Sequence, residues 1–183
     1  MMYCGTNKTA LQSQKQASEA MIHLLREKPF SQITISELCK LAGISRQTFY
    51  SLFSSREDVM VFTLQAQYCE DLSLDVPDQP AGPDETLRWL CRSYSAYILR
   101  HQALIRLLVE NRIDHLLYDS LFDALTRCDC LLQRADPCTR RYAASFFAGG
   151  VTCVARCYAE EGCSSSESQL ESLLETLLSG RLF

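Results

Sequence analysis

Long apolar runs are missing from this sequence of 183 residues. None approaches the roughly 20 apolar residues that a transmembrane helix requires. The N-terminal residues, MMYCGTNKTALQSQ, also lack the apolar core of a secretory signal peptide. These absences argue against a membrane partner and predict a cytoplasmic protein. With 47% hydrophobic and 22% charged residues, the composition is that of a globular chain that can bury a core.

Signatures of catalysis and of metal binding are missing as well. The sequence holds no nucleophile elbow, phosphate-binding loop, HExxH motif or triad-like order, so we predict neither an enzyme nor a bound cofactor. Ten cysteines are present, but no CxxC pair and no Cys/His cluster with the spacing of metal ligands. We therefore expect no metal site.

The cysteines leave two interpretations open. In a reducing compartment a buried cysteine behaves as a small hydrophobic residue, which makes most of the ten ordinary packing residues. Cys153 and Cys157 are four residues apart and would share one face of a helix, where we expect inert packing. The alternative is a thiol-based redox-sensing regulator.

Strand signals are scarce, because no convincing alternation of apolar and polar residues occurs, whereas helical spacing recurs throughout. We predict an all-α protein of about nine helices, with a three-helix region at the N-terminus and a larger helical domain after it. The expected helices cover 8–27, two short segments starting near Thr34 and Ser45, a segment from Ser54 to about Leu72, and 84–100, 102–110, 113–133, 138–161 and 166–179.

Helix-start signals are crowded into the segment 34–59, TISELCKLAGISRQTFYSLFSSREDV. Thr34-Ile-Ser-Glu37 is a capping box, in which a hydroxyl and a carboxylate satisfy the first free amides of a helix. Gly43 supplies a tight turn, Ser45 caps the next short helix, and Ser54-x-x-Glu57 opens a longer one. Two short helices joined by such a turn are typical of the helix-turn-helix, whose second helix enters the major groove of DNA.

The exposed side of the second short helix carries groups that suit nucleic acid. Arginine pairs with guanine edges, glutamine pairs with adenine, and threonine can contact a thymine methyl group. These groups are Arg46, Gln47 and Thr48, and Tyr50 adds a hydroxyl that can reach a phosphate. Thr34 and Ser45 lie at helix N-termini, where free amides favour an anion. A helix pair buried in a core would explain the caps, but not this exposed polar edge.

The net charge of −4 conceals a division between the two parts of the chain. Residues 1–54 hold six basic and three acidic residues, a charge of +3, and the remainder holds twelve and nineteen, a charge of −7. The N-terminal part can therefore approach the polyanion DNA, although the chain as a whole is acidic.

The segment KPFSQITISELCKLAGISRQTFYSLFSSREDV, from Lys28 to Val59, resembles the DNA-binding region of the TetR family of transcriptional regulators. KPFSQITIS and SRQTFY resemble most the branch around regulators of dihydroxyacetone kinase operons. The resemblance implies phosphate contacts from Thr34, Ser45, Tyr50 and Arg56, and base contacts from Arg46, Gln47 and Thr48. Arg56 departs from the commoner lysine, which keeps the charge but changes its geometry.

The resemblance also implies a sequence-specific regulator, most often a repressor, that binds a palindromic operator in double-stranded DNA as a homodimer. Residues 1–54 would form the DNA-binding domain and residues 55–183 a helical domain for dimerisation and for a small-molecule effector. The rival from another class is a helical interaction protein that keeps this fold without binding DNA.

Two apolar stripes near the C-terminus predict the dimer interface. Small residues on one helix permit close approach of another, and a leucine stripe follows on the next helix, so two helices from each subunit could form a four-helix bundle. The expected interface residues are Phe146, Gly149, Gly150, Cys153, Leu173 and Leu177. The alternative is that these stripes pack inside a monomer.

Aromatic residues of the middle helices are candidates for the lining of an effector pocket. They are Trp89, Tyr94, Tyr97, Tyr118, Phe122 and Phe147. The alternative is that these side chains are plain core, and the sequence does not name a ligand.

Overall fold

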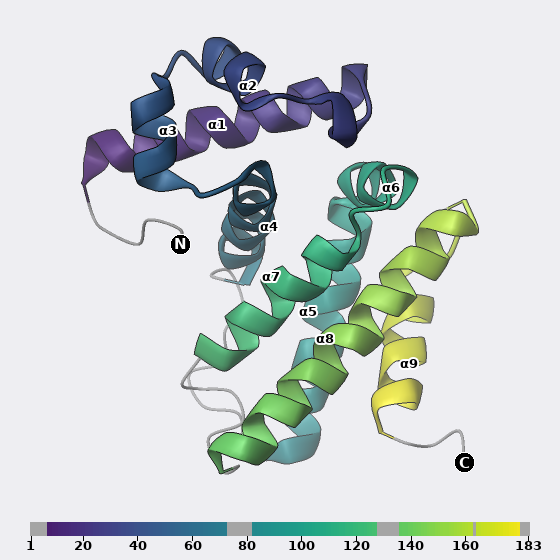
Figure 1. The fold of residues 1–183 in the computed structure, drawn as a ribbon. Coiled ribbons are helices and arrows are strands. Elements are labelled where there is room, and N and C mark those ends of the chain that lie inside the picture. Colours follow the sequence, from purple (N-terminus) through teal and green to yellow (C-terminus); the bar gives the residue numbers. More distant parts are fainter. Residues whose placement is uncertain (1–6, 73–81, 128–135, 163, 180–183) are drawn as a thin grey trace. The chain divides into compact units, whose positions relative to one another are not determined.

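The computed structural model describes residues 7–72, 82–127, 136–162 and 164–179 (Figure 1). All the regular secondary structure in these ranges is helical, which confirms the prediction of an all-α protein with about nine helices. The elements are α1 (Lys8–Glu27), the short 3-10 helix η1 (Phe30–Gln32), α2 (Ile35–Ala42), α3 (Arg46–Leu52), α4 (Arg56–Leu72), α5 (Pro83–Arg100), α6 (Gln102–Glu110), α7 (His115–Arg127), α8 (Pro137–Glu160) and α9 (Glu167–Leu178).

The chain forms two compact units, an N-terminal unit (Met1–Ala66) and a C-terminal unit (Gln67–Phe183). The division lies within α4, since that helix runs from Arg56 to Leu72. The functional boundary expected after residue 54 rests on the charge of the two parts and on the helix-turn-helix motif rather than on packing, and it stays a prediction.

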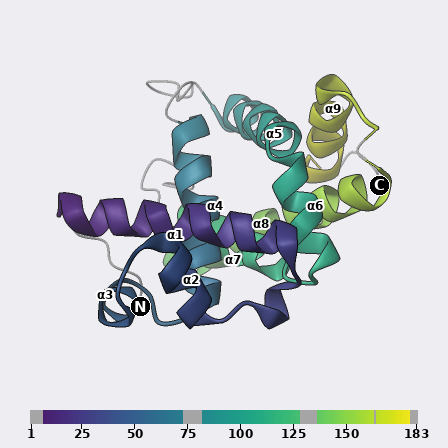
Figure 2. The same ribbon diagram turned by 90° about the horizontal axis from the view of Figure 1, so that it is seen from above.

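The N-terminal unit is built around α1, which packs against α2 and α3 (Figure 2). The apolar stripe of α1 is buried, with Ala17 and Met21 inaccessible to solvent. Phe49 of α3 is equally inaccessible, and Phe53, just after α3, packs against it with 5.6 Å between ring centroids. The outer residues of α3 therefore rest on an aromatic layer.

Caps explain where the helices of the N-terminal unit begin and end. The capping box at Thr34 and Glu37 is present, Gly43 ends α2 in the left-handed conformation with φ of 67°, and Ser45 caps α3. The predicted start of α4 is one residue too early. The Asp58 amide donates to Ser55 Oγ, and the Ser54 amide donates to the Asp58 carboxylate. The side chains that accept the capping hydrogen bonds are therefore Ser55 and Asp58 instead of Ser54 and Glu57.

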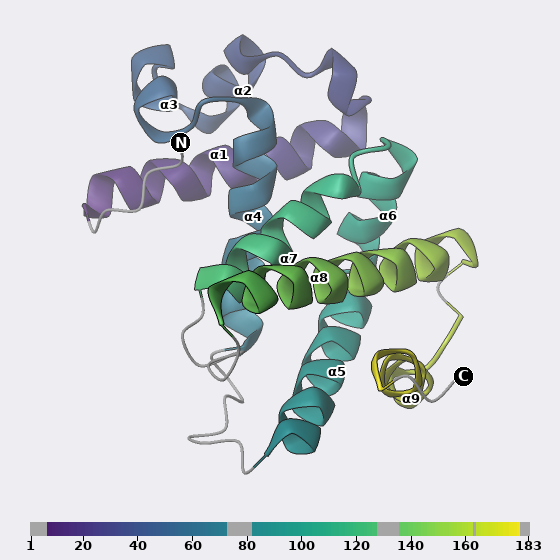
Figure 3. The ribbon, with the colours of Figure 1, turned by 60° about the horizontal axis from the view of Figure 1, so that its bottom comes forward.

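The main helix pairings of the C-terminal unit join α5 to α9, α7 to α8 and α6 to α8. The packing of α7 against α8 can be followed in Figure 3. Tyr94 and Ile98 of α5 and Ala144 and Ala148 of α8 are inaccessible to solvent and form part of the core. The helix expected over 113–133 begins at His115, and its predicted residues 128–133 lie outside the described ranges. None of the described helices is long and apolar enough to cross a membrane.

Candidate functional site

The outer edge of α3 presents polar side chains to solvent. Arg46 and Gln47 are exposed, and Tyr50 is 52% exposed although the residue before it, Phe49, is buried. The Phe49 and Tyr50 rings meet edge to face, with 5.5 Å between their centroids. Because Phe49 anchors the helix from below, these three side chains are held on a firm backbone while their polar ends remain accessible.

Ser45 and Thr48 are occupied by the helix start itself. The Thr48 amide donates to Ser45 Oγ over 2.9 Å, and the two hydroxyl oxygens share a hydrogen bond of 2.8 Å. These bonds fix the first turn of α3 and use part of the capacity of both hydroxyls. Arg46 and Gln47, which follow Ser45 directly and are exposed, are therefore better placed than Thr48 to reach a base edge.

Thr34 belongs to a similar network at the start of α2. Its hydroxyl donates to Glu37 Oε2 over 2.7 Å, its amide donates to the same oxygen over 3.0 Å, and Lys28 Nζ donates to Glu37 Oε1 over 2.6 Å. The hydrogen bond from Lys28, followed by those from Thr34, lowers the pKa of Glu37 to about 2. A charged Glu37 therefore fixes the start of α2 and offsets the charge of Lys28.

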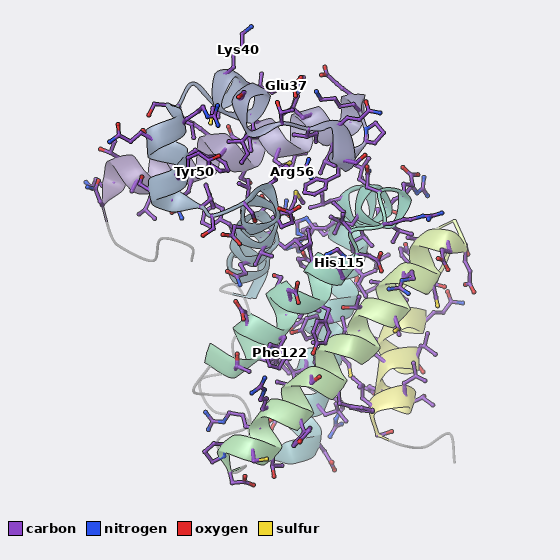
Figure 4. The ribbon with its side chains drawn as sticks, viewed as in Figure 1. Glu37, Lys40, Tyr50, Arg56, His115 and Phe122 are labelled. Atoms are coloured by element: carbon purple, nitrogen blue, oxygen red, sulfur yellow. The ribbon has the colours of Figure 1, made fainter. Side chains whose placement is uncertain are left out.

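Lys40 was not among the predicted site residues. It lies in the last turn of α2, is exposed, and extends away from the helices of the N-terminal unit (Figure 4). The sequence signal that could have found it is its place at the C-terminal end of the first helix of the pair, five residues before the cap Ser45. It adds an exposed positive charge to this unit.

Arg56 has a different environment from the one expected of a phosphate ligand. Its Nη1 donates to the carbonyl oxygens of Phe30, over 2.8 Å, and of Ile33, over 2.5 Å. Its guanidinium carbon lies 4.5 Å from the centroid of the Phe30 ring, and its side chain is 26% exposed. The family resemblance implies a phosphate contact for Arg56, and in the structure its guanidinium bonds to the segment between α1 and α2.

The aromatic residues nominated for an effector pocket have two kinds of environment. Tyr94 and Tyr97 are fully buried, whereas Trp89, Tyr118, Phe122 and Phe147 are half-buried. Tyr94 packs on Phe147 with ring centroids 5.1 Å apart, and Tyr118 shares a hydrogen bond of 2.8 Å with Ser145. Tyr94 and Tyr97 thus fit the alternative of plain core.

A cavity of about 400 Å³ opens between α7 and α8 of the C-terminal unit. Its lining takes Phe122 from the six nominated aromatics (Figure 4) and adds Thr126, Pro137, Arg140 and Arg141. Neither arginine was among the residues that the sequence predicted for a pocket. An apolar wall with cationic groups at its edge suits a ligand with both an apolar and an anionic part.

The C-terminal helices α8 and α9 expose an apolar groove of about 440 Å³, which we call the α8–α9 groove. Phe146 is 71% exposed, Leu173 45% and Leu177 38%, values that are high for such side chains in a folded chain. The lining includes Phe146, Gly150, Cys153, Leu170, Leu173 and Leu177. Five of the six predicted interface residues therefore meet in one groove, and Gly149 is next to it in sequence.

The two glycines of α8 are not required by the chain's own packing. A Cβ atom built at Gly149 would have no atom within 4 Å outside its own helix, and one at Gly150 would meet Leu178 at an ordinary 3.6 Å. Leu178 belongs to α9, so α9 comes near Gly150, whereas no described residue from another element comes near Gly149. Space above Gly149 is open.

The cysteines divide into buried and exposed positions. Burial raises the pKa of the Cys91 thiol to about 12 and also raises that of Cys39, so both thiols stay protonated and inert. Cys153 and Cys157 are exposed in the single chain. The expectation that both are packed away is therefore not met within one subunit, because the face of α8 that carries them is the open side of the α8–α9 groove.

Residues 19–61 match the family model described as "Bacterial regulatory proteins, tetR family". The chain is 36% identical over 69 residues to the HTH-type transcriptional regulator EthR of Mycobacterium tuberculosis, a stretch that covers 37% of this chain and 32% of EthR. The match thus spans about a third of the length of the curated relatives. The residues matched by the family model contain α2, α3 and the exposed edge formed by Arg46, Gln47 and Tyr50.

Solved structures resemble the chain over nearly its whole length. The TetR family repressor AlkX from Dietzia sp. superposes with a TM-score of 0.54 at 22% identity, covering 92% of this chain and 94% of AlkX. The dihydroxyacetone kinase operon activator DhaS superposes with a TM-score of 0.51 at 20% identity, covering 92% of this chain and 95% of DhaS. At such identities the resemblance establishes the fold alone.

Proposed function

The chain belongs to the TetR family of bacterial regulatory proteins, and on that premise we propose that it represses transcription by binding a palindromic operator as a homodimer. A small-molecule effector would release it from DNA. The observation that carries the proposal is the exposed edge of α3: Arg46, Gln47 and Tyr50 are exposed, whereas Phe49 on the same helix is buried.

The roles of these side chains follow from their chemistry and exposure. Arg46 and Gln47 extend from the first turn of α3 and would read base edges in the major groove. Tyr50 would donate its hydroxyl to a phosphate, which positions the helix but carries no sequence information. Lys40 adds a second candidate for a phosphate contact, and the positive charge of residues 1–54 favours the approach to DNA.

The α8–α9 groove supports the homodimer. Large apolar side chains rarely gather on an exposed surface without a partner, and here they lie near Gly149, which no described residue from another element approaches within 4 Å. A second copy of α8 and α9 would cover the groove and complete a four-helix bundle. Two helix-turn-helix units related by a two-fold axis would then match a palindrome with half-sites about one DNA turn apart.

The effector part of the proposal rests on the cavity between α7 and α8. Its volume of about 400 Å³ is within the range of small-molecule sites, and Phe122, Arg140 and Arg141 offer it both apolar and cationic contacts. Isothermal titration with carboxylic acids of increasing chain length would test this part, with Arg141→Gln as the variant expected to lose the carboxylate contact.

DNA selection from a random library with the purified protein tests the proposed function. The expected result is enrichment of a palindrome, with protection of both half-sites in a footprint. Failure to enrich any sequence would favour the helical interaction protein that keeps the fold without DNA binding. The Arg46-Gln47 edge would then have no role.

The exposure of Cys153 and Cys157 gives one observation in favour of the thiol-sensing alternative. If a dimer covers the α8–α9 groove, both thiols should react slowly with a maleimide in the intact protein. Fast modification accompanied by loss of operator binding would support redox sensing instead.

A further inference from the structure

The guanidinium of Arg56 connects two parts of the N-terminal unit that are 26 residues apart in sequence. Its Nη1 donates to the carbonyl oxygens of Phe30, the first residue of η1, and of Ile33, the residue that follows η1, and it lies 3.5 Å from that of Ser31. The guanidinium carbon is 4.5 Å from the Phe30 ring centroid, and the Phe30 side chain is itself buried. Arg56 is the first residue of α4, so the contact ties the start of α4 to η1.

The segment that Arg56 contacts leads directly into α2. Ile33 ends η1 and is buried, and the next residue, Thr34, is the N-cap of α2. The Lys28–Glu37 ion pair secures the other side of the same segment. Only three residues, 43–45, connect α2 to α3, and the two helices pack on each other, so a shift at Ile33 would be passed to the recognition helix α3.

We propose that Arg56 is a positioning residue for base reading rather than a phosphate ligand, an inference that rests on the proposed function. By holding the start of α4 against η1, it sets the orientation of α2 and α3 and thereby the reach of Arg46 and Gln47. Any movement of α4 that breaks this contact would loosen the helix-turn-helix.

The geometry disfavours the phosphate role for three reasons. The Nη1 protons are taken by carbonyl oxygens, and one face of the guanidinium lies on the Phe30 ring. The Nη2 atom lies 3.8 Å from Glu57 Oε1, and that negative charge would repel a phosphate. Arginine suits the positioning role better than lysine, because a planar fork can donate to two carbonyls while it stacks on an aromatic ring.

The test compares Arg56→Gln and Arg56→Lys with Arg26→Gln. The control removes the same charge from an exposed position in the last turn of α1. Operator and non-cognate DNA would be titrated at several salt concentrations with variants shown by circular dichroism to be folded. Hydrogen exchange without DNA would follow the amides of Leu38 and Phe49, which bond to Thr34 and Ser45 oxygens, with Leu170 as a reference in the C-terminal unit.

We expect Arg56→Gln to lower the ratio of cognate to non-cognate affinity by about tenfold, the discrimination that one base contact provides, with the salt slope unchanged. Arg56→Lys should lie between this variant and the wild type, and the Leu38 and Phe49 amides should exchange faster while Leu170 does not. Arg26→Gln should leave the affinity ratio unchanged. Global destabilisation without a positioning role would lower stability but leave the ratio of the folded protein intact.

A salt slope that is shallower by about 0.9 for each chain in Arg56→Gln and restored in Arg56→Lys would show a phosphate contact and overturn the proposal. An unchanged affinity ratio in both folded variants would also overturn it. If Arg56→Gln does not fold, the same criteria apply to Arg56→Lys. If the wild type selects no DNA sequence, the proposed function fails. Hydrogen exchange still tests the position of Arg56 in that case: if the Leu38 and Phe49 amides exchange equally fast in Arg56→Gln and in the wild type, Arg56 is not a positioning residue.

Discussion

Two exposed surfaces of this protein differ in the chemistry that they offer a partner. The outer edge of α3 presents Arg46, Gln47 and the hydroxyl of Tyr50, whereas the α8–α9 groove presents Phe146 and a leucine stripe. Each surface contains an aromatic ring that is more than half exposed. The polar edge suits a hydrated, charged partner that must be released, and the apolar groove suits a partner that stays bound.

This difference also explains why the two surfaces tolerate change differently. A polar side chain on α3 can be shortened without exposing the core, because Phe49 and Phe53 remain buried beneath it. A charge placed in the α8–α9 groove would have to be desolvated whenever a partner covers it. Substitutions on the two surfaces should therefore affect different equilibria.

The largest effect is expected from the double substitution Leu173→Arg and Leu177→Arg. A buried, unpaired charge costs more than about 2 kcal/mol at an interface, so the dimer dissociation constant should rise by more than about thirtyfold. Sedimentation velocity at micromolar concentration measures the change. Ser172→Arg, at an exposed position of α9 that does not line the groove, is the matched control. A double variant that remains dimeric would exclude the groove as the interface.

A smaller effect is expected on the polar edge from Tyr50→Phe. The loss of one hydrogen bond to a phosphate should weaken binding by about 0.5–1.5 kcal/mol for each chain, equally on cognate and non-cognate DNA. Arg46→Ala, by contrast, should weaken binding mainly to the cognate sequence. Competition titrations with both DNAs separate the two patterns, and a sequence-dependent effect of Tyr50→Phe would contradict its assignment to phosphate.

Alanine substitutions at two glycines, one beside each surface, should have opposite effects on stability. Gly43 has φ of 67°, so Gly43→Ala should destabilise the N-terminal unit by about 1 kcal/mol. Gly149 lies inside α8 with open space above it, so Gly149→Ala should stabilise the helix by up to about 1 kcal/mol and yet weaken the dimer. Denaturant unfolding and sedimentation measure the two quantities. A Gly149→Ala variant with an unchanged dimer constant would remove this glycine from the interface.

The smallest effect is expected from the pH dependence of Glu37. Its pKa is lowered to about 2 in the folded state from an ordinary value of 4.5, because Lys28 and Thr34 bond to the carboxylate. The ionised form therefore stabilises the fold above pH 4.5, and this contribution is lost as the pH falls from about 4.5 to about 2. Unfolding of the wild type and of Glu37→Gln should differ above pH 4.5 and converge in acid. A constant difference across this range would exclude the carboxylate as its source.

Local signals in the sequence predicted the helices well, since caps and apolar spacing act over a few residues. Thr34 and Glu37 form the expected capping box, and Ser45 caps α3. The start of α4 was predicted one residue early, because Ser54 and Ser55 are both acceptable caps and Asp58 is as good a partner as Glu57. Sequence spacing alone does not decide between two such registers.

Side-chain environments that depend on distant residues were harder to predict. Arg56 bonds to carbonyls more than twenty residues away, and its orientation depends on the folded position of η1. Cys153 and Cys157 lie on an apolar face, but only the structure shows that the helices in the described part of the chain leave both exposed. The sequence does not distinguish the buried Tyr94 and Tyr97 from aromatic residues that line a pocket, because residue type alone does not reveal how deeply a side chain is buried.

The central claim, that the exposed edge of α3 reads DNA bases, is tested most directly at Gln47. Wild type and Gln47→Ala should be titrated against the operator and against operators carrying each single base-pair change, at two salt concentrations. We predict that Gln47→Ala loses about 1–3 kcal/mol of discrimination at one base pair in each half-site, with an unchanged salt slope. Equal weakening on every sequence, or no change on any, would contradict the placement of α3 in the major groove.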